Sequence, residues 1–477
     1  MHASLQPSSL VLALLALPLA LPASAERVLA AYIFARHGDR TAKVLKNTEL
    51  TDLGYNEVFD TGSYYRSRYI QANSSRHIQG INVNLVKLSQ ISASSPSDDV
   101  LQNSATAFLQ GVYPPVGTAA RETLADGTVV EVPLDGYQLI PVTTTSAGSN
   151  SEDTTWLQSA TDCRNAEVSS NNYYSSKLYT SLLKSTKDFY YTLSFLLNGT
   201  FSESAMTFKN AYSIFDYLNV GSIHNNSHGA TGDELHQLLL LANIEQYNLA
   251  YNASETVRAI AGATLAGDVL ESLNKTVTSQ GKTRLGVQFG SYGTFLSYFG
   301  LAQLPTVNVN FTGIPDYASS MAWELVTNST KDFPDASELS VRFFFHNGTI
   351  TGSAAPTEYS LYGQSNATMS WSDFVSQTKK IAVGSTSQWC QACGNTDGQC
   401  ASYTNSSDSG SNPDSAPAET QSSHHGVSRA VAGVIGAIVT LAVTLGVEAL
   451  VLLLGGFQIR KKRDADEDAA DEENKTS

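Results

Sequence analysis

The chain has 477 residues, of which 42% are hydrophobic and only 15% are charged. The apolar content is enough for a sizeable core and excludes a wholly disordered chain. Acidic residues outnumber basic ones and give a net charge of −15, which argues against a nucleic-acid partner because such binders present a basic face.

The first predicted element is a short apolar run at residues 8–21, followed by Ala23-Ser24-Ala25. The small-residue pattern is typical of a signal-peptidase cleavage site, and the run is too short for a stable membrane span. We therefore predict that residues 1–25 form a signal peptide and that the mature chain begins near Glu26. An uncleaved anchor is the alternative.

A continuous apolar run, Val28–Ala35, comes next and predicts a strand buried on both faces, as in a parallel sheet. The polar segment Arg36–Thr41 interrupts it. From Thr51 onward, apolar and aromatic residues recur at three-to-four spacing, which predicts a helix with Thr51 at its N-cap. Strand, polar turn and helix in this order are typical of an active-site edge of an α/β sheet.

The polar turn reads Arg36-His37-Gly38-Asp39-Arg40-Thr41. The planar guanidinium of arginine matches two phosphate oxygens at once. A histidine between two such groups can attack phosphorus as a nucleophile, and Gly38 permits a close backbone approach. The alternative is a charged turn that only caps the following helix.

The middle of the chain, about residues 170–275, is mostly helical by its apolar spacing, and strand patterns return at Arg284–Phe289 and Leu339–Phe345. We therefore predict an α/β core formed by residues 26–120 and 276–400, with a helical cap, residues 121–275, inserted between them.

Four cysteines, Cys163, Cys390, Cys393 and Cys400, follow in the predicted ectodomain. In an oxidising compartment they would form disulfides, and four cysteines allow three pairings that the sequence does not distinguish. Cys390-x-x-Cys393 could also indicate zinc or redox chemistry, but no second such pair accompanies it. We favour structural disulfides.

The C-terminal part is predicted to be a Ser/Asn-rich stalk (401–428), a transmembrane helix (429–457) and a charged tail (458–477). Glu448 interrupts the apolar run and would lie in the span or near its inner interface. The basic residues Arg460–Arg463 place the tail in the cytosol. We predict a single-pass type I protein of the secretory pathway, at the plasma membrane or cell surface.

Ten N-x-S/T sequons on the predicted luminal side support a glycosylated ectodomain. Their asparagines are Asn73, Asn198, Asn225, Asn252, Asn274, Asn310, Asn328, Asn347, Asn366 and Asn405.

With these segments identified, the chain resembles the histidine acid phosphatases, the two-domain branch of the histidine phosphatase superfamily. Besides Arg36–Thr41, the resemblance is carried by Leu50–Gly54, Arg66–Tyr69, Ser104-Ala105, Phe108–Pro115, Tyr317–Ser320, Glu324-Leu325 and Val341–Phe345. It implies a phosphoglycerate-mutase-like fold with a Rossmann-like three-layer core and a helical cap. It also implies hydrolysis of a phosphomonoester through a phosphohistidine, without a metal or other cofactor.

The resemblance makes His37 the nucleophile and Arg36 and Arg40 the phosphate ligands. The rest of the family's site differs here. The family's third phosphate-binding arginine is missing, since no Lys or Arg occurs between Leu88 and Gly117. The family's late His-Asp pair, whose Asp protonates the leaving oxygen, corresponds to Ser291 and Tyr292.

Other histidines are weaker candidates. His346-Asn347 resembles a His-Asp pair, but it follows Tyr317–Leu325, whereas the family's pair precedes that segment, and Asn347 lies in a sequon. His224 and His228 have the four-residue spacing of metal ligands on a helix, but they flank a sequon and resemble a loop. We expect no metal at either place.

Two functions remain open on the sequence. The intact motif favours a cell-surface phosphomonoesterase acting through His37 on a phosphate-containing small molecule. The missing arginine and His-Asp pair favour a pseudophosphatase, which would bind a phosphorylated ligand or partner without efficient turnover. A phosphomutase is a third and weaker hypothesis, because the predicted topology separates it from cytosolic substrates.

Overall fold

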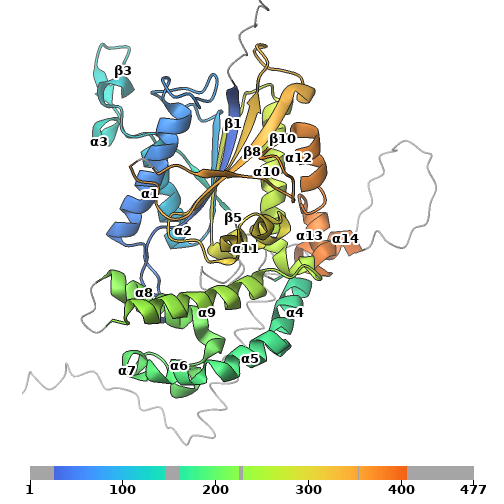
Figure 1. The fold of residues 1–477 in the computed structure, drawn as a ribbon. Coiled ribbons are helices and arrows are strands. Elements are labelled where there is room, and N and C mark those ends of the chain that lie inside the picture. Colours follow the sequence, from blue (N-terminus) through green and yellow to red (C-terminus); the bar gives the residue numbers. More distant parts are fainter. Residues whose placement is uncertain (1–25, 146–161, 225–228, 353, 405–477) are drawn as a thin grey trace, which may run out of the picture. The chain divides into compact units, whose positions relative to one another are not determined.

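A central sheet with helices on both faces makes up the core (Figure 1). The computed structural model describes residues 26–145, 162–224, 229–352 and 354–404, all within one unit, Met1–Asp408. The predicted signal peptide, transmembrane helix, tail and the stalk after residue 404 lie outside these residues, as do Asn225, His228 and Asn405.

The sheet is mixed. Its strand order is β10-β8-β7-β1-β6-β2-β5, with β9 paired to β8. Strands β1, β6, β2 and β5 run parallel, whereas β7, β8, β9 and β10 are joined by antiparallel pairs. The Rossmann-like core that the resemblance implied therefore describes the parallel half only. The strands are β1 (Arg27–Arg36), β2 (Ile91–Pro96), β5 (Val142–Thr145), β6 (Leu285–Gly290), β7 (Ser320–Thr327), β8 (Leu339–His346), β9 (Thr357–Tyr359) and β10 (Thr368–Ser370).

Strand β1 lies at the centre of this sheet and is buried along nearly its whole length, as its apolar run predicted. Alternate side chains point to opposite faces. Ala31 and Ile33 belong to one core cluster with residues of the first two long helices, and Tyr32 and Phe34 belong to a second cluster on the other face. The strands predicted at Arg284–Phe289 and Leu339–Phe345 are confirmed as β6 and β8.

Helices cover both faces of the sheet (Figure 1). One face packs against α1 (Asp52–Tyr65) and α2 (Asp99–Val112). The other packs against α10 (Ile260–Thr278), α11 (Tyr292–Leu301) and α12 (Trp371–Thr378). The predicted N-cap of the first helix is confirmed, because the Thr51 side chain accepts a hydrogen bond from the Gly54 backbone N–H.

The predicted helical middle is also confirmed. Its helices are α4 (Arg164–Asn172), α5 (Lys177–Ser185), α6 (Lys187–Thr192), α7 (Ser194–Leu197), α8 (Ala211–Ile223) and α9 (Gly232–Ala250). They surround a separate core cluster rich in tyrosine and leucine. Helix α9 begins with a capping box, in which Thr231 and Glu234 each satisfy a backbone N–H of the other.

The range 121–275 that we predicted as a cap is not all helical, and it does not all lie in the cap. It contains the hairpin β3 (Arg121–Thr123) and β4 (Val129–Glu131), the short α3 (Pro133–Gly136), and β5. The β-branched residues of β5 join the central sheet beside β2, and α10 packs against the sheet. Both belong to the core.

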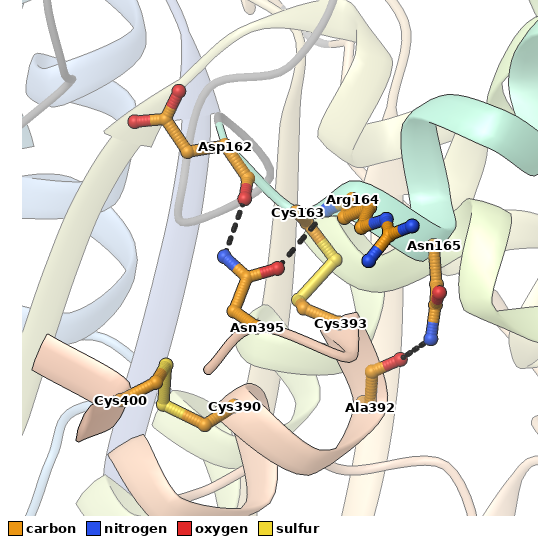
Figure 2. The surroundings of a disulfide bond; sticks show 9 residues. All are labelled: Asp162, Cys163, Arg164, Asn165, Cys390, Ala392, Cys393, Asn395 and Cys400. Atoms are coloured by element: carbon orange, nitrogen blue, oxygen red, sulfur yellow. Dashed lines mark hydrogen bonds between the residues drawn. A yellow bond between two sulfur atoms is a disulfide. The ribbon is translucent and has the colours of Figure 1, made fainter. Parts of the chain in front are cut away.

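Two disulfides lie at the C-terminal end of the described chain: one links it to the residue before α4, and the other is local to that end (Figure 2). Cys163 pairs with Cys393, and Cys390 pairs with Cys400. The structural disulfides that we favoured are thus present, and the two cysteines of the C-x-x-C segment bond to different partners. Helix α13 (Thr386–Cys393) carries one cysteine of each pair, and α14 (Ala401–Thr404) follows. Within the described ranges, no helix has both the length and the apolarity needed to cross a membrane.

Candidate functional site

The motif Arg36–Thr41 lies where β1 leaves the sheet. Arg36 is the last residue of β1 and pairs in register with Gly290, the last residue of β6. The chain segments that follow these two parallel strands therefore leave the same edge of the sheet, which is where α/β proteins place their ligands. His37 and Arg40 are fully buried, and the Arg36 side chain is 4% exposed.

Two glycines allow the turn to sit against helix α1. A Cβ atom added to Gly38 would lie 2.2 Å from the Gly54 backbone oxygen, and one added to Gly54 would lie 2.1 Å from the Asp39 oxygen. Any larger residue at either position would clash with backbone. This contact explains why the Leu50–Gly54 segment accompanies the motif in the sequence. Ser104, from another segment of the resemblance, accepts a hydrogen bond from the Gly38 N–H.

The orientation of His37 follows from one hydrogen bond. Its Nδ1 lies 2.7 Å from the Gly38 carbonyl oxygen. Because a carbonyl can only accept, Nδ1 carries the hydrogen, and in the neutral ring the lone pair is then on Nε2. Nε2 is therefore the atom of His37 that can act as a nucleophile.

Both motif arginines have partners inside the protein. The Arg36 guanidinium donates to the Pro315 carbonyl. Arg40 forms an ion pair with Asp216 of α8 at 2.9 Å and donates to the Tyr212 hydroxyl at 3.2 Å. Asp216 and Tyr212 both belong to α8, so the cap contributes directly to the environment of the motif.

The ring of Tyr317 lies against three residues of the motif. Its centroid is 4.6 Å from the Arg36 guanidinium carbon, 5.8 Å from that of Arg40 and 5.5 Å from the His37 ring centroid. Guanidinium groups at these distances are attracted to the face of an aromatic ring. Burial raises the pKa of the Tyr317 hydroxyl well above its usual range, so the ring is neutral and contributes no competing anion.

Lys43 is a third cation near the motif that our sequence analysis missed. Its ammonium lies 5.3 Å from the ring centroids of both Tyr212 and Tyr292. Its backbone N–H donates to Asp216, the same carboxylate that pairs with Arg40. We had searched for a third cation only before α2, where the family has its arginine. The two-residue spacing from Thr41 was the signal that could have found Lys43.

Glu57 is a second residue that we missed. It projects from α1, and its Oε2 accepts the Asp39 backbone N–H at 2.7 Å. Burial raises the pKa of the Glu57 carboxyl to about 7, although the Asp39 N–H and the nearby Arg36 oppose this shift. Its place on the first turns of the helix after the motif was the available signal.

His224 also contacts the motif. Its Nε2 lies 2.7 Å from Asp39 Oδ2, and the Thr51 hydroxyl donates to the same oxygen at 2.5 Å. We had weighed His224 only as one of a possible metal pair with His228. Among the residues that the structure describes, no group of three or more His, Cys, Asp or Glu side chains could hold a metal ion.

Ser291 and Tyr292 lie at the edge of the sheet beside the motif. Ser291 directly follows Gly290 and occupies the N-cap position of α11 without a side-chain capping hydrogen bond, and the Tyr292 ring centroid is 5.4 Å from the Arg36 guanidinium carbon. The Tyr292 hydroxyl donates to Gln246 of α9 at 3.0 Å. Their correspondence to the family's His-Asp pair stays a prediction.

His346 ends β8, and its Nδ1 lies 3.0 Å from the Gly348 carbonyl oxygen. The neighbouring Asn347 binds Asp316 through its side-chain amide. His346 lines a different cavity from the one that Arg36 lines. The structure thus gives no reason to revise our decision to set this residue aside.

A cavity of about 400 Å³ opens beside Arg36, between the cap helices and the segment around Tyr317. Arg36, Glu57, Asp216, Asp316 and His236 supply its ionisable side chains. Its apolar lining is Tyr212, Phe215, Ile223, Leu235, Leu239, Ile314, Pro315 and Tyr317. The cavity is therefore a place where a group attached to a phosphate at Arg36 could lie.

Another family-like pair is structural. Arg68 binds the fully buried Glu324 through two nitrogens, at 2.9 and 2.6 Å, and the Tyr69 hydroxyl donates to the same carboxylate. A buried carboxylate needs such partners, because an unpaired charge is costly in the interior. The Arg66–Tyr69 and Glu324-Leu325 segments thus join the π-helical turn after α1 to β7.

Comparison with models of known protein families shows to which family this chain belongs. A family model described as histidine phosphatase superfamily (branch 2) matches residues 43–346. The chain belongs to this branch of the superfamily. The matched range begins after Thr41, so the membership does not depend on the motif from which our argument began.

The chain is similar to solved structures of phytases. The phytase of Hafnia alvei, in its apo form, is 11% identical, with 78% of this chain and 98% of that chain covered and a TM-score of 0.51. The phytase of Klebsiella sp. ASR1 is 12% identical (75% and 95% covered, TM-score 0.48), and that of Citrobacter braakii is 14% identical (77% and 99%, TM-score 0.48). A search of curated protein sequences found no match. At these identities the likeness to the Hafnia enzyme shows a shared mixed α/β fold.

Proposed function

We propose that this protein hydrolyses phosphomonoesters through a phosphohistidine on His37. The observation that carries the proposal is the placement of His37 between Arg36 and Arg40 at the carboxyl end of β1, with Nδ1 held by the Gly38 carbonyl. This placement presents Nε2 as the nucleophile next to two fixed cations. Membership of the histidine phosphatase superfamily supports a phosphatase-type function.

The reaction has two steps. Nε2 of His37 attacks phosphorus, an N–P bond forms, and the bond from phosphorus to the leaving oxygen breaks as that oxygen takes a proton. Water then attacks the phosphohistidine, the N–P bond breaks, and phosphate is released while the water gives up a proton. Arg36 and Arg40 neutralise the charge on the phosphoryl oxygens in both steps.

Glu57 is our candidate for the group that gives and takes this proton. Three carboxyls line the cavity beside Arg36. Asp216 is paired with Arg40, and Asp316 is bonded to the Asn347 amide. Glu57 has a pKa of about 7, raised by burial, so at acidic pH it carries a proton that it can donate to a leaving oxygen.

The test is a steady-state assay of the purified ectodomain on an aryl and an alkyl phosphate at acidic pH, followed by acid-quenched trapping of a phosphorylated chain. We expect turnover of the aryl ester and a phosphorylated His37 peptide. Turnover without a phosphorylated chain in the native protein, and undiminished in His37→Ala, would refute the mechanism.

The second candidate is a pseudophosphatase that binds a phosphorylated ligand or partner. The observation in its favour is that Arg40 is fully buried in its ion pair with Asp216, while Tyr317 lies against Arg36, His37 and Arg40. Phosphate must displace these contacts to reach the motif. Calorimetry with inorganic phosphate separates the candidates from a pure scaffold, because both require binding that weakens in Arg36→Ala.

We also propose that the protein is a glycosylated, single-pass type I protein of the secretory pathway with its phosphatase-like part outside the cytosol. In the structure, seven sequon asparagines are exposed: Asn73, Asn198, Asn274, Asn310, Asn328, Asn347 and Asn366. Glycopeptide mapping should find sugar at several of them and none at Asn474, which lies in a sequon of the predicted cytoplasmic tail. Sugar at Asn474 would contradict the orientation.

A further inference from the structure

We propose that the cavity beside Arg36 holds the leaving group and selects monoesters whose leaving group is apolar and bears no further negative charge. This inference rests on the proposed phosphatase function. It excludes polyphosphorylated compounds as preferred substrates, although the fold is shared with a phytase.

The position of the cavity ties it to the reaction. Arg36 is a phosphate ligand in the proposed mechanism, and it also lines the cavity wall. Tyr317, whose ring lies against the His37 ring, lines the same cavity. A phosphoryl group held by Arg36 would therefore direct its ester oxygen and the attached group into this space.

The charge of the lining disfavours a second phosphate. Arg36 is the one Lys or Arg side chain among the described residues that line the cavity, and it is needed for the reacting phosphoryl group. Three carboxyls line the same space: the charge of Asp216 is balanced by Arg40, Glu57 is ionised only above its pKa of about 7, and Asp316 adds a further negative charge. Each further phosphate carries between one and two negative charges near neutral pH, and like charges in a partly buried site repel.

The other two cations near the motif do not change this balance. Arg40 is already paired with Asp216. The Lys43 ammonium lies over the rings of Tyr212 and Tyr292, and Lys43 is not part of the cavity lining. Both cations can support the reacting phosphoryl group from the motif side, and neither is among the residues that line the cavity.

The apolar lining favours a leaving group whose hydrocarbon part is transferred from water into the cavity. Phe215 and Ile223 of α8 and Leu235 and Leu239 of α9 line the cavity from the cap, and Ile314 lines it from the opposite side. Transfer of an apolar chain or ring into such a space is favourable in proportion to the area buried. A polar sugar or polyol would gain nothing from this apolar area, although Asn219 and Thr349 also line the cavity.

The experiment compares leaving groups of the same chemical kind. Hexyl phosphate and glycerol 1-phosphate are both alkyl monoesters, so differences in leaving-group acidity do not dominate the comparison. With the purified glycosylated ectodomain at acidic pH, we expect kcat/KM for hexyl phosphate to exceed that for glycerol 1-phosphate by at least tenfold. Inositol hexakisphosphate should be the poorest of the three. An equal or higher kcat/KM for glycerol 1-phosphate or inositol hexakisphosphate would overturn the inference and leave the proposed function standing.

A neighbouring pair of leucines on α9 provides the matched variants. Leu239 lines this cavity and also the second one, whereas Leu240 lines the second cavity alone and is 49% exposed. Leu239→Asp should raise KM for hexyl phosphate at least tenfold and leave glycerol 1-phosphate nearly unchanged. Leu240→Asp should change neither. A loss of hexyl preference in both variants, or in neither, would contradict the assignment of this cavity.

If the ectodomain hydrolyses none of these esters, the proposed function fails, and the same ligands test the cavity by calorimetry. Hexyl phosphate should then still bind at least tenfold more tightly than glycerol 1-phosphate, and Leu239→Asp should remove the difference. Equal binding of the two esters would overturn the inference on its own.

Discussion

The two parallel strands that end side by side at the site, β1 and β6, carry different chemistry beyond their last residues. Behind β1 come Arg36, His37 and Arg40, two cations and a nucleophile. Behind β6 come Ser291 and Tyr292, which have neither the charge nor the acidity of the His-Asp pair that the resemblance implied. The pairing of Arg36 with Gly290 brings the two segments together, but the charged side chains follow β1 only.

This difference indicates where a replacement for the missing groups must come from. Ser291 and Tyr292 offer only hydroxyls, which are weaker acids than the carboxyl of the family's Asp. The structure places Glu57 of α1 and Lys43 near the β1 segment instead. These additional charged groups come from the chain segments that follow β1, although the Lys43 ammonium also reaches the Tyr292 ring on the β6 side.

The largest effect on the hydrolysis rate should appear when one residue on the β1 side and one on the β6 side are each replaced by alanine. His37→Ala should abolish hydrolysis of an aryl phosphate, because the covalent intermediate can no longer form. Ser291→Ala should keep the rate within about tenfold, a change of about 1.4 kcal/mol in the barrier. Steady-state rates of the two purified ectodomains decide the matter. A loss in Ser291→Ala as large as that in His37→Ala would show that the β6 side takes part in the chemistry.

The second effect concerns the proton donor. Glu57→Gln keeps an oxygen that can accept the Asp39 N–H but removes the ionisable proton. We expect hydrolysis of an alkyl phosphate to fall by roughly 10²–10⁴-fold, the usual contribution of a general acid, with little change for an activated aryl phosphate.

The role of Glu57 as proton donor also predicts how the activity changes with pH. Burial raises the pKa of Glu57 to about 7, so the donor is protonated below that pH and ionised above it. Alkyl phosphatase activity of the native chain should therefore decline as pH rises through about 7, and Glu57→Gln should lose this decline. A native profile without a limb near pH 7, or one that Glu57→Gln keeps, would exclude Glu57 as the donor.

The β1 side could be predicted well from the sequence, because the features that define it are close together along the chain. A continuous apolar run identifies β1, the motif follows it directly, and Thr51 marks the start of α1. The two glycines that allow the turn to approach the helix are also close in sequence. No distant residue is needed to place His37 at the end of a buried strand.

The parts that the sequence did not predict depend on contacts between distant segments. Arg40 and Asp216 are 176 residues apart, and His224 meets Asp39 across 185 residues. The disulfide Cys163–Cys393 spans 230 residues and could not be chosen among three pairings. Strand β5 is short and follows a hairpin. Its place in the sheet depends on pairing with β2, and the periodicity of the sequence does not identify that partner.

The third prediction tests the cationic side by binding. Arg36→Ala should weaken the binding of inorganic phosphate by about 1.5–3 kcal/mol, the range for a hydrogen bond to a charged group. That corresponds to roughly 10–150-fold in Kd. Isothermal titration of native and variant ectodomains measures it, with Arg342→Ala, a partly buried arginine of β8 paired with Glu26, as the control. Unchanged affinity in Arg36→Ala would place phosphate elsewhere.

The smallest effect should come from the tyrosine on the β6 side. The Tyr292 hydroxyl donates to Gln246, so Tyr292→Phe removes one buried hydrogen bond and should lower the free energy of unfolding by about 0.5–1.5 kcal/mol. Tyr298→Phe, on the same helix, removes the acceptor of the Trp323 N–H in the core and should have a similar effect on stability.

If Tyr292 only supports the cap, neither variant changes the alkyl-to-aryl rate ratio or the pH profile. If Tyr292 were the proton donor, Tyr292→Phe alone would depress alkyl ester hydrolysis, by far more than its change in stability explains. Denaturant unfolding and the two-substrate assay, run on both variants, separate these cases.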